Sequence, residues 1–407
     1  MATNPAVKGA LLYDVESGGW AEVSTTYPTR LPIKGEINSI LAAALQPLEP
    51  AQITEQHNNA GRRDALMPKA MKFDVPLYLT GHGTSCASGA IAATALGTFL
   101  ARCLGAINAG QTSGTVNTGT SAVQFSLTTA VGVAGALFRL GELADGDGEG
   151  QFYVWSNPDT ATVLNAAADT PAGGAVVYGA ETIHCNETLT TMTSMRMNAL
   201  TANQRLGIFG IYCEGATFSG FGVGELPEVV CHMVASFFDE ESASTWPTDV
   251  AVESFVPAPC TAGQLFYQTV ATTTRDILAV RDVKIDLAVE TFPLLGYNAA
   301  RQYQSIIGCV RGASKMRITW TMDADAAGTQ TVLDAWEAGT LKHILFAANT
   351  ADGQAVAFYL SNAKPVGDRP SQRTVSGLNQ ITVTYEGLAG PTSTTELTHS
   401  AWRMALA

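Results

Sequence analysis

Apolar and polar residues alternate along most of the second half of the chain, a period of two that is typical of strands with one buried face. A short helical pattern at Thr331–Glu337, ended by Gly339, interrupts this alternation. The stretch from Phe292 to Arg311 is predicted to be a long loop that joins the first two strands. The strands predicted for this half are Val283–Glu290, Met316–Asp323, His343–Ala347, Gln354–Ser361 and Leu378–Glu386.

A weaker version of the same order of elements occurs in the first half. A possible strand at Ala51–Glu55 is followed by a loop, Glu55–Lys72, and then by an alternating strand, Lys72–Thr80. A helical pattern comes next, and Gly105 is its predicted stop. Three strands close this half as well: Leu189–Asn198, Arg205–Glu214 and Glu228–Phe238. The order of elements matches between the halves better than the identity of the residues does, so the hypothesis is a duplicated unit.

These patterns predict a mainly β protein with two tandem domains, each with one flanking helix and one long loop. The predicted divisions are an N-terminal arm at 1–35, a first domain at 36–240 with an insertion at about 106–186, a linker at 241–263, a second domain at 264–390 and a C-terminal tail at 391–407.

Composition narrows the class of protein. Only 14% of the residues are charged and the net charge is −13, so the chain lacks the clustered Lys and Arg that nucleic-acid binding requires. The seven cysteines are odd in number and form no C-x-x-C pair, which argues against a disulfide framework and a structural zinc site. No signal sequence or membrane-spanning run is predicted, so folding in a cytoplasm is expected.

One segment, Gly81–Gly89, resembles the nucleophile segment of subtilisin-like proteases, with Ser85 as the nucleophile. Histidine and aspartate partners in suitable segments are missing upstream. The simpler interpretation is that Thr84 or Ser85 caps the helix that follows. We therefore expect neither an enzyme nor a bound cofactor or metal.

The two strands joined by a long loop, followed by a helix and closing strands, resemble the tail tube proteins of long-tailed, siphovirus-like bacteriophages. The resemblance implies two tandem β-sandwich or half-open barrel domains. It also implies that three copies form a ring equivalent to a hexamer, and that rings stack into a tube that conducts DNA. The residues that bear the resemblance are Val283–Glu290, Tyr297–Arg311, Met316–Asp323, Thr331–Glu337, His343–Ala347, Gln354–Ser361 and Leu378–Glu386.

The same resemblance suggests roles for particular residues. Even spacing places Asp282, Asp286 and Glu290 on one face of a strand, which would be an acidic wall of the bore; a solvated outer face is the alternative. The predicted inter-subunit loops contain Arg62, Arg63, Tyr297, Arg301 and Arg311.

Further copies of the chain, a tape-measure protein and baseplate or terminator proteins are the expected partners. The expected location is a virion assembled in the host cytoplasm, without a membrane, and viral DNA would pass through without specific binding. Two alternatives stay open. One is a baseplate hub or tail-completion protein present in a single ring, and the other is a carbohydrate-binding β adhesin.

Overall fold

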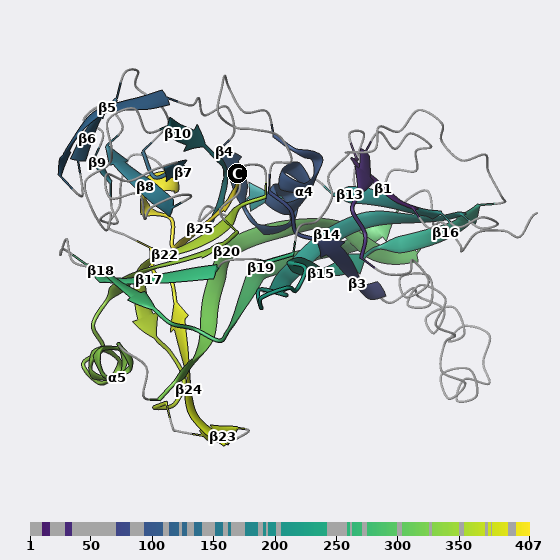
Figure 1. Cartoon of the computed structure of the whole chain (residues 1–407). Helices are drawn as coiled ribbons and strands as arrows, with labels where there is room; N and C mark the ends of the chain where they lie inside the picture. Colours follow the sequence, from purple (N-terminus) through teal and green to yellow (C-terminus); the bar gives the residue numbers. More distant parts are fainter. Residues whose placement is uncertain are drawn as a thin grey trace, which may run out of the picture.

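The structure is a computed structural model of the chain and is mainly β, as the alternation predicted (Figure 1). It describes residues 10–16, 29–34, 71–81, 93–108, 114–121, 124–127, 134–140, 151–157, 162–163, 176–185, 190–192, 194–200, 205–241, 259–260, 263–270, 275–298, 303–324, 328–349, 354–370, 373–375, 377–389 and 396–407.

One sheet, called here the long sheet, runs through both halves of the chain, and all its pairings are antiparallel. Two short strands pair beside it, β12 (Thr190–Thr191) next to β20 and β23 (Arg373–Val375) next to β24. In spatial order its main strands are β3 (Met71–Tyr78), β15 (Glu228–Ala235), β14 (Arg205–Ser219), β19 (Asp282–Asn298), β20 (Tyr303–Asp323) and β24 (Leu378–Glu386).

A second sheet, called here the covered sheet, packs against the long sheet. In spatial order it contains β18 (Arg275–Leu278), β17 (Gly263–Thr269), β21 (Lys342–Ala348), β22 (Val356–Pro365), β25 (Trp402–Leu406), β11 (Glu181–His184) and β4 (Ala106–Asn108).

A small sheet and a closed barrel complete the β structure. The small sheet contains β2 (Thr29–Leu31), β1 (Ala10–Val15), β13 (Met195–Leu200), the first part of β14, and β16 (Phe237–Glu241). The barrel contains β10 (Val176–Gly179), β5 (Gly114–Ser121), β6 (Gln124–Leu127), β9 (Thr162–Val163), β8 (Gln151–Asn157) and β7 (Leu137–Leu140), all within the predicted insertion. The helices are α4 (Ala95–Leu104), α5 (Thr329–Glu337) and α6 (Glu396–His399).

Two predictions about the chain need correction. The stretch from Phe292 to Arg311 is not a long loop, because β19 and β20 pair along most of it as far as Asn298 and Tyr303. The predicted C-terminal tail contains a strand, β25, which pairs with β22 on one side and β11 on the other. The fold therefore uses both segments as sheet.

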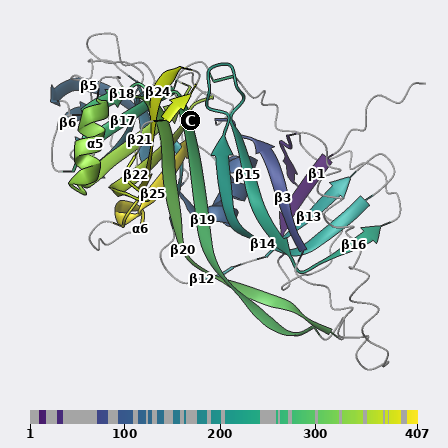
Figure 2. The same cartoon turned by 90° about the horizontal axis from the view of Figure 1, so that it is seen from below.

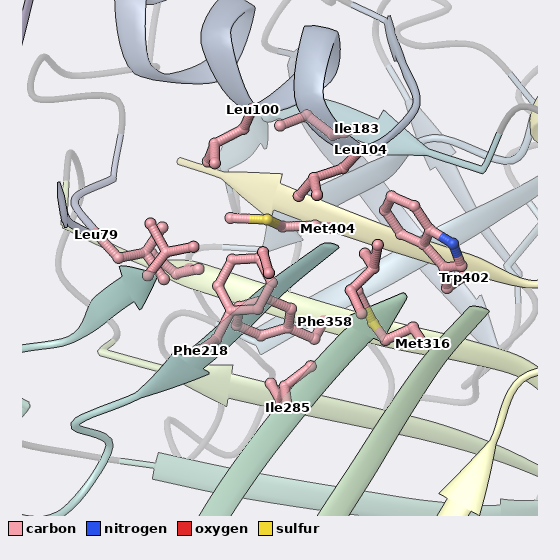
Figure 3. Packing of buried hydrophobic residues seen from close by; sticks show 14 of the residues in the cluster. Leu79, Leu100, Leu104, Ile183, Phe218, Ile285, Met316, Phe358, Trp402 and Met404 are labelled. Atoms are coloured by element: carbon pink, nitrogen blue, oxygen red, sulfur yellow. The ribbon is translucent and has the colours of Figure 1, made fainter. Parts of the chain in front are cut away.

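The main core lies between the long sheet, the covered sheet and α4. Figure 3 shows Leu100 and Leu104 of α4 near Met404 of the covered sheet, with Phe218 and Ile285 of the long sheet nearby. All five side chains belong to one buried cluster. The alternating strands supply these residues from one face only, which is why the other face of the long sheet is left to solvent.

The covered sheet is buried on both faces. Its second face, which includes Phe266, Leu345 and Tyr359, packs against Leu137 and Phe152 of the barrel. Every residue of β21 and β25 is buried, so these strands show no alternation of exposure. The insertion thus has a structural role: it covers apolar surface that the covered sheet would otherwise expose.

Strand β14 belongs to two sheets and changes direction at Gly210. This glycine has a φ of 62°, which a residue with a side chain rarely adopts. The buried carboxylate of Glu16 accepts a hydrogen bond from the Gly210 N–H and another from the Ser194 hydroxyl. The Ser236 hydroxyl donates to the Gly210 carbonyl at 3.1 Å, so the bend is held from both sides.

Helix α4 is held at both ends by charged side chains from other elements. Its N-cap is Thr94, not Thr84 or Ser85, because the Thr94 hydroxyl accepts from the Gly97 N–H at 2.9 Å. The fully buried Glu181 carboxylate accepts from the Thr94 N–H at 3.0 Å and from its hydroxyl at 2.9 Å. At the other end the guanidinium of Arg311 lies against the last carbonyls of the helix. Both charges complement the helix dipole.

A buried polar group lies on the barrel side of the covered sheet. The His343 Nδ1 and the Tyr359 hydroxyl are 2.7 Å apart, and Arg403 lies over the Tyr359 ring. Burial, aided by the positive charge of Arg403, lowers the pKa of His343 from 6.5 to about 4. His343 is therefore neutral in the folded chain near neutral pH.

The carboxylate at the start of α4 gives a stability prediction. Glu181→Ala should lower the free energy of unfolding by about 3 kcal/mol, since two partly buried donors of Thr94 lose a charged acceptor. Glu337→Ala is the control, because Glu337 forms an exposed ion pair with Arg369 and its loss should cost about 1 kcal/mol or less. Denaturant unfolding monitored by circular dichroism measures both. Equal losses would contradict the capping role of Glu181.

The histidine gives a pH prediction. Between pH 6.5 and pH 4 the unfolded chain binds a proton at His343 that the folded chain does not. The free energy of unfolding is therefore unaffected by His343 above pH 6.5 and decreases as the pH falls toward 4. The loss should reach about 3 kcal/mol. Urea unfolding across this range should show a smaller pH dependence for His343→Gln than for the parent. Identical slopes would exclude the contribution.

Candidate assembly surface

The exposed face of the long sheet is polar across both halves of the chain. On β19 the residues Val283, Ile285 and Leu287 are buried, while Asp282 and Lys284, which alternate with them, are exposed. The same alternation continues on the neighbouring strands. The polar residues on this face are Lys72, Asp74, Thr217, Glu228, His232, Asp282, Lys284, Asp286, Glu290, Lys315, Arg317, Thr319, Thr321, Asp323, Thr382, Thr384 and Glu386.

The three acids singled out from the sequence lie together on this polar face, but they do not form a bare acidic wall. Lys284 lies between Asp282 and Asp286 on the same strand, and its Nζ is 3.0 Å from an Asp286 carboxylate oxygen. Among the described residues Asp282 and Glu290 have no ion-pair partner. These two carboxylates are the uncompensated charges of β19.

Ion pairs neutralise most other acids on or beside the face. Arg281 binds Asp323 through two hydrogen bonds, at 2.6 and 2.9 Å. The remaining pairs are Arg317 with Glu386 at 2.8 Å, Lys72 with Glu214 at 2.7 Å, and Lys34 with Glu228. A hydrogen bond of 2.8 Å joins His232 Nδ1 to Asp74. The surface is a mosaic of both signs and offers no cluster of free cations for phosphate groups.

Hydroxyl groups fill the space between the charges. Thr319 and Thr384 are joined at 2.9 Å, and Thr321 and Thr382 at 3.1 Å, in two successive cross-strand pairs. Thr217 donates to Asp286 at 3.1 Å, across the junction between the two halves. These bonds hold polar side chains flat against the sheet.

The junction itself is the pairing of β14 with β19. Four residue pairs connect the strands, from Gly215 opposite Ala288 to Phe218 opposite Ile285. Gly215 is required there, since a Cβ atom at this position would lie 2.4 Å from the Leu287 carbonyl oxygen. The first-half strands and the second-half strands become one sheet through this contact.

Beyond the sheet, β19 and β20 continue together as a two-stranded ribbon, called here the arm and defined as residues 291–298 and 303–310. Figure 2 shows this ribbon running past β12 and away from the rest of the molecule. No charged residue occurs in either strand of the arm. Its large apolar side chains are partly exposed, at 46% for Phe292, 46% for Leu294, 64% for Leu295 and 45% for Ile307. Exposed large apolar side chains on an uncharged ribbon are typical of contact sites for other proteins.

The arm is anchored along the inner half of its β20 strand, as far out as Ile306. Ile306 and Cys309 pack in a small buried cluster with Met192, Tyr212 and Val234. In addition, the Met192 N–H donates to the Cys309 carbonyl at 2.8 Å. The opposite face of the arm has no covering element among the described residues.

The residues predicted for inter-subunit loops fall in different places. Arg62, Arg63 and Arg301 lie outside the described residues. Tyr297 is in β19 near the end of the arm, paired with Gln304. Arg311 is inside β20 and only 8% exposed, and its hydrogen bonds go to α4 of the same chain. The apolar residues of the arm were missed, although twenty residues with one charge, from 291 to 310, were a visible signal.

Two features are absent from the described part of the chain. None of its helices has the length and apolar character needed to cross a membrane. It also contains no group of three or more His, Cys, Asp or Glu arranged to hold a metal ion.

Comparison with known proteins gives only partial matches. No protein-family model matches the chain, and no curated protein matches it. A chain of the anti-feeding prophage baseplate is 11% identical, with 32% of this chain and 91% of that chain covered and a TM-score of 0.26. A chain in the tail of an empty GTA particle is 12% identical (32% and 96% covered, TM-score 0.21).

A chain from the virion of the native gene transfer agent is 13% identical, with 31% of this chain and 92% of that chain covered and a TM-score of 0.20. All three similarities are confined to about a third of this chain. At TM-scores of this size they decide neither its fold nor its function.

Proposed function

We propose that the chain is a structural subunit of a virion, and that it assembles into the tube of a phage-type tail as rings of three copies. The observation that supports this most is the long sheet, which passes unbroken through both halves with one apolar and one polar face. A continuous sheet of this kind can become one-third of a closed barrel whose polar face lines a bore. The proposal assigns the chain no catalysis.

The edges of the long sheet support ring closure. Residues 71–75 of β3 pair with β15 alone among the described residues, and the centre of β24, from Ile381 to Val383, pairs with β20 alone. Open edges expose unpaired backbone groups and invite pairing with another strand. In a ring of three copies, β3 of one copy would meet β24 of the next, and no edge would remain.

The mosaic of charges suits a bore that DNA crosses without binding. Paired cations are held by carboxylates at 2.6 to 3.0 Å and are not free to bind phosphate, while Asp282 and Glu290 repel it. A tape-measure protein would occupy the same bore before DNA passes. Baseplate and terminator proteins would contact the two ends of the tube.

The arm supplies the contact between copies. Its exposed apolar side chains and lack of charge fit an apolar surface on a second copy, where burial of each side chain would contribute about 1 to 2 kcal/mol. A single-ring hub with the same domains is the second candidate, since the arm could then dock on a neighbouring ring of another protein. No described feature favours a carbohydrate-binding adhesin.

Electron microscopy of the purified chain tests the assembly. We expect tubes of indefinite length with threefold rings, whereas single closed rings would favour the hub. Monomers under all assembly conditions would contradict both.

A charge placed on the arm tests the contact. Leu295→Asp should raise the concentration needed for tube formation by about tenfold or more, because burying a carboxylate costs over 1.4 kcal/mol. The melting temperature should not change, since Leu295 is 64% exposed. Val223→Asp is the matched control, at an 88% exposed residue away from the arm. Equal effects of the two variants would remove the arm from the proposal.

Charge reversal on the polar face tests the bore. Tubes carrying Asp282→Lys, Asp286→Lys and Glu290→Lys together should retain DNA at low salt and release it as salt rises, while parent tubes should not retain it. A control with Asp276→Lys, Asp334→Lys and Asp368→Lys adds the same charge at exposed positions off this face. Retention by the control alone would mean that the polar face is on the outside of the tube.

A further inference from the structure

Arg311 lies where the arm leaves the body of the molecule. Its guanidinium donates to three carbonyl oxygens at the end of α4, those of Gly105 at 2.9 Å, Arg102 at 3.3 Å and Ala101 at 3.5 Å. Burial lowers the pKa of Arg311, but an arginine keeps its charge at neutral pH. The contact therefore joins a full positive charge to the negative end of a helix.

This contact lies at the point on β20 where the arm begins. Arg311 pairs with Thr190 of β12, and the next residue toward the arm, Val310, pairs with Thr191. Farther out, the last described contacts between the arm and the body are those of Cys309 and Ile306. A ribbon that is supported only along its inner half takes its direction from the residues there. Two charged residues flank the root, and of these Arg311 binds the body, whereas Glu290 has no ion-pair partner among the described residues.

The partners of Arg311 also belong to the other half of the chain. Helix α4 is a first-half element, whereas β20 and the arm are second-half elements. The far end of α4 is held by Glu181, so the helix is a fixed support and not a loose one. The arm of one half is thus aligned on the helix of the other half.

We propose that Arg311 is a positioning residue, which fixes the direction of the arm by binding the C-terminal carbonyls of α4 and thereby prepares the arm to dock on a second copy. The docking part rests on the proposed function. The positioning part concerns a single folded chain and can be tested separately. A purely stabilising role for Arg311 in α4 is the competing explanation.

Hydrogen exchange of the chain below its assembly concentration tests the positioning. In Arg311→Met the amides of 292–298 and 303–309 should exchange about tenfold faster than in the parent, while the amides of β21 and β24 should not change. Arg317→Met is the matched control, because Arg317 lies on the same strand and binds Glu386 on the polar face. Glu181→Ala loosens α4 from its other end, so it should also speed the exchange of the arm amides, but by less than Arg311→Met does.

Assembly is then measured at equal amounts of folded protein. Arg311→Met should form tubes more slowly, and Arg311→Lys should be intermediate, because an ammonium keeps the charge but cannot span three carbonyls in the same way. Uniformly faster exchange over the whole chain would favour the purely stabilising role. Arm exchange and tube formation at parent levels would overturn the proposal.

Two outcomes keep this proposal apart from the proposed function. If the parent forms no tubes but Arg311→Met still releases the arm, the tube is wrong and the positioning stands. If Arg311→Met fails to fold, Arg311→Lys decides, and unchanged arm exchange in that variant overturns the positioning.

Discussion

Four residue pairs between β14 and β19 make one sheet out of two halves. Without this contact each half would have its own three-stranded sheet, and β14 and β19 would become two additional edge strands. The close approach at Gly215 leaves no room for a side chain, so the spacing of the two strands is fixed by the backbone. The continuous polar face across both halves of the chain follows from that junction.

The alternating pattern gives the long sheet one face that packs in the core and one face that forms a polar surface. The inward residues pack against the covered sheet and α4, and their burial stabilises the fold. The outward residues are joined mainly to one another, by ion pairs across strands and by hydroxyl pairs. Such pairs contribute little to the free energy of folding at an exposed surface. Their arrangement therefore determines the charge pattern of the surface more than it stabilises the fold.

Alternation predicted the regular parts of the chain well. The bounds of β24 match the predicted Leu378–Glu386, because a strand with one buried face has a clear period of two. It failed for β25, whose two faces are both buried and whose tail position suggested no partner. It also failed for the arm, where Pro293, Gly296 and Gly308 are typical of a loop. Arg311 was predicted to lie in an inter-subunit loop because its partners, the carbonyls of α4, are about 200 residues away and leave no sign in the local pattern.

The placement of β25 has a consequence for how the chain folds. Cys185 and Ser400, which are 215 residues apart, are joined by a hydrogen bond where β25 enters the covered sheet beside β11. Contacts of such high sequence separation have a large loop-closure cost and form late. The final strand thus completes a sheet whose other members come from both halves, so neither half reaches its native state by itself. The covered sheet therefore couples the folding of the two halves of the chain.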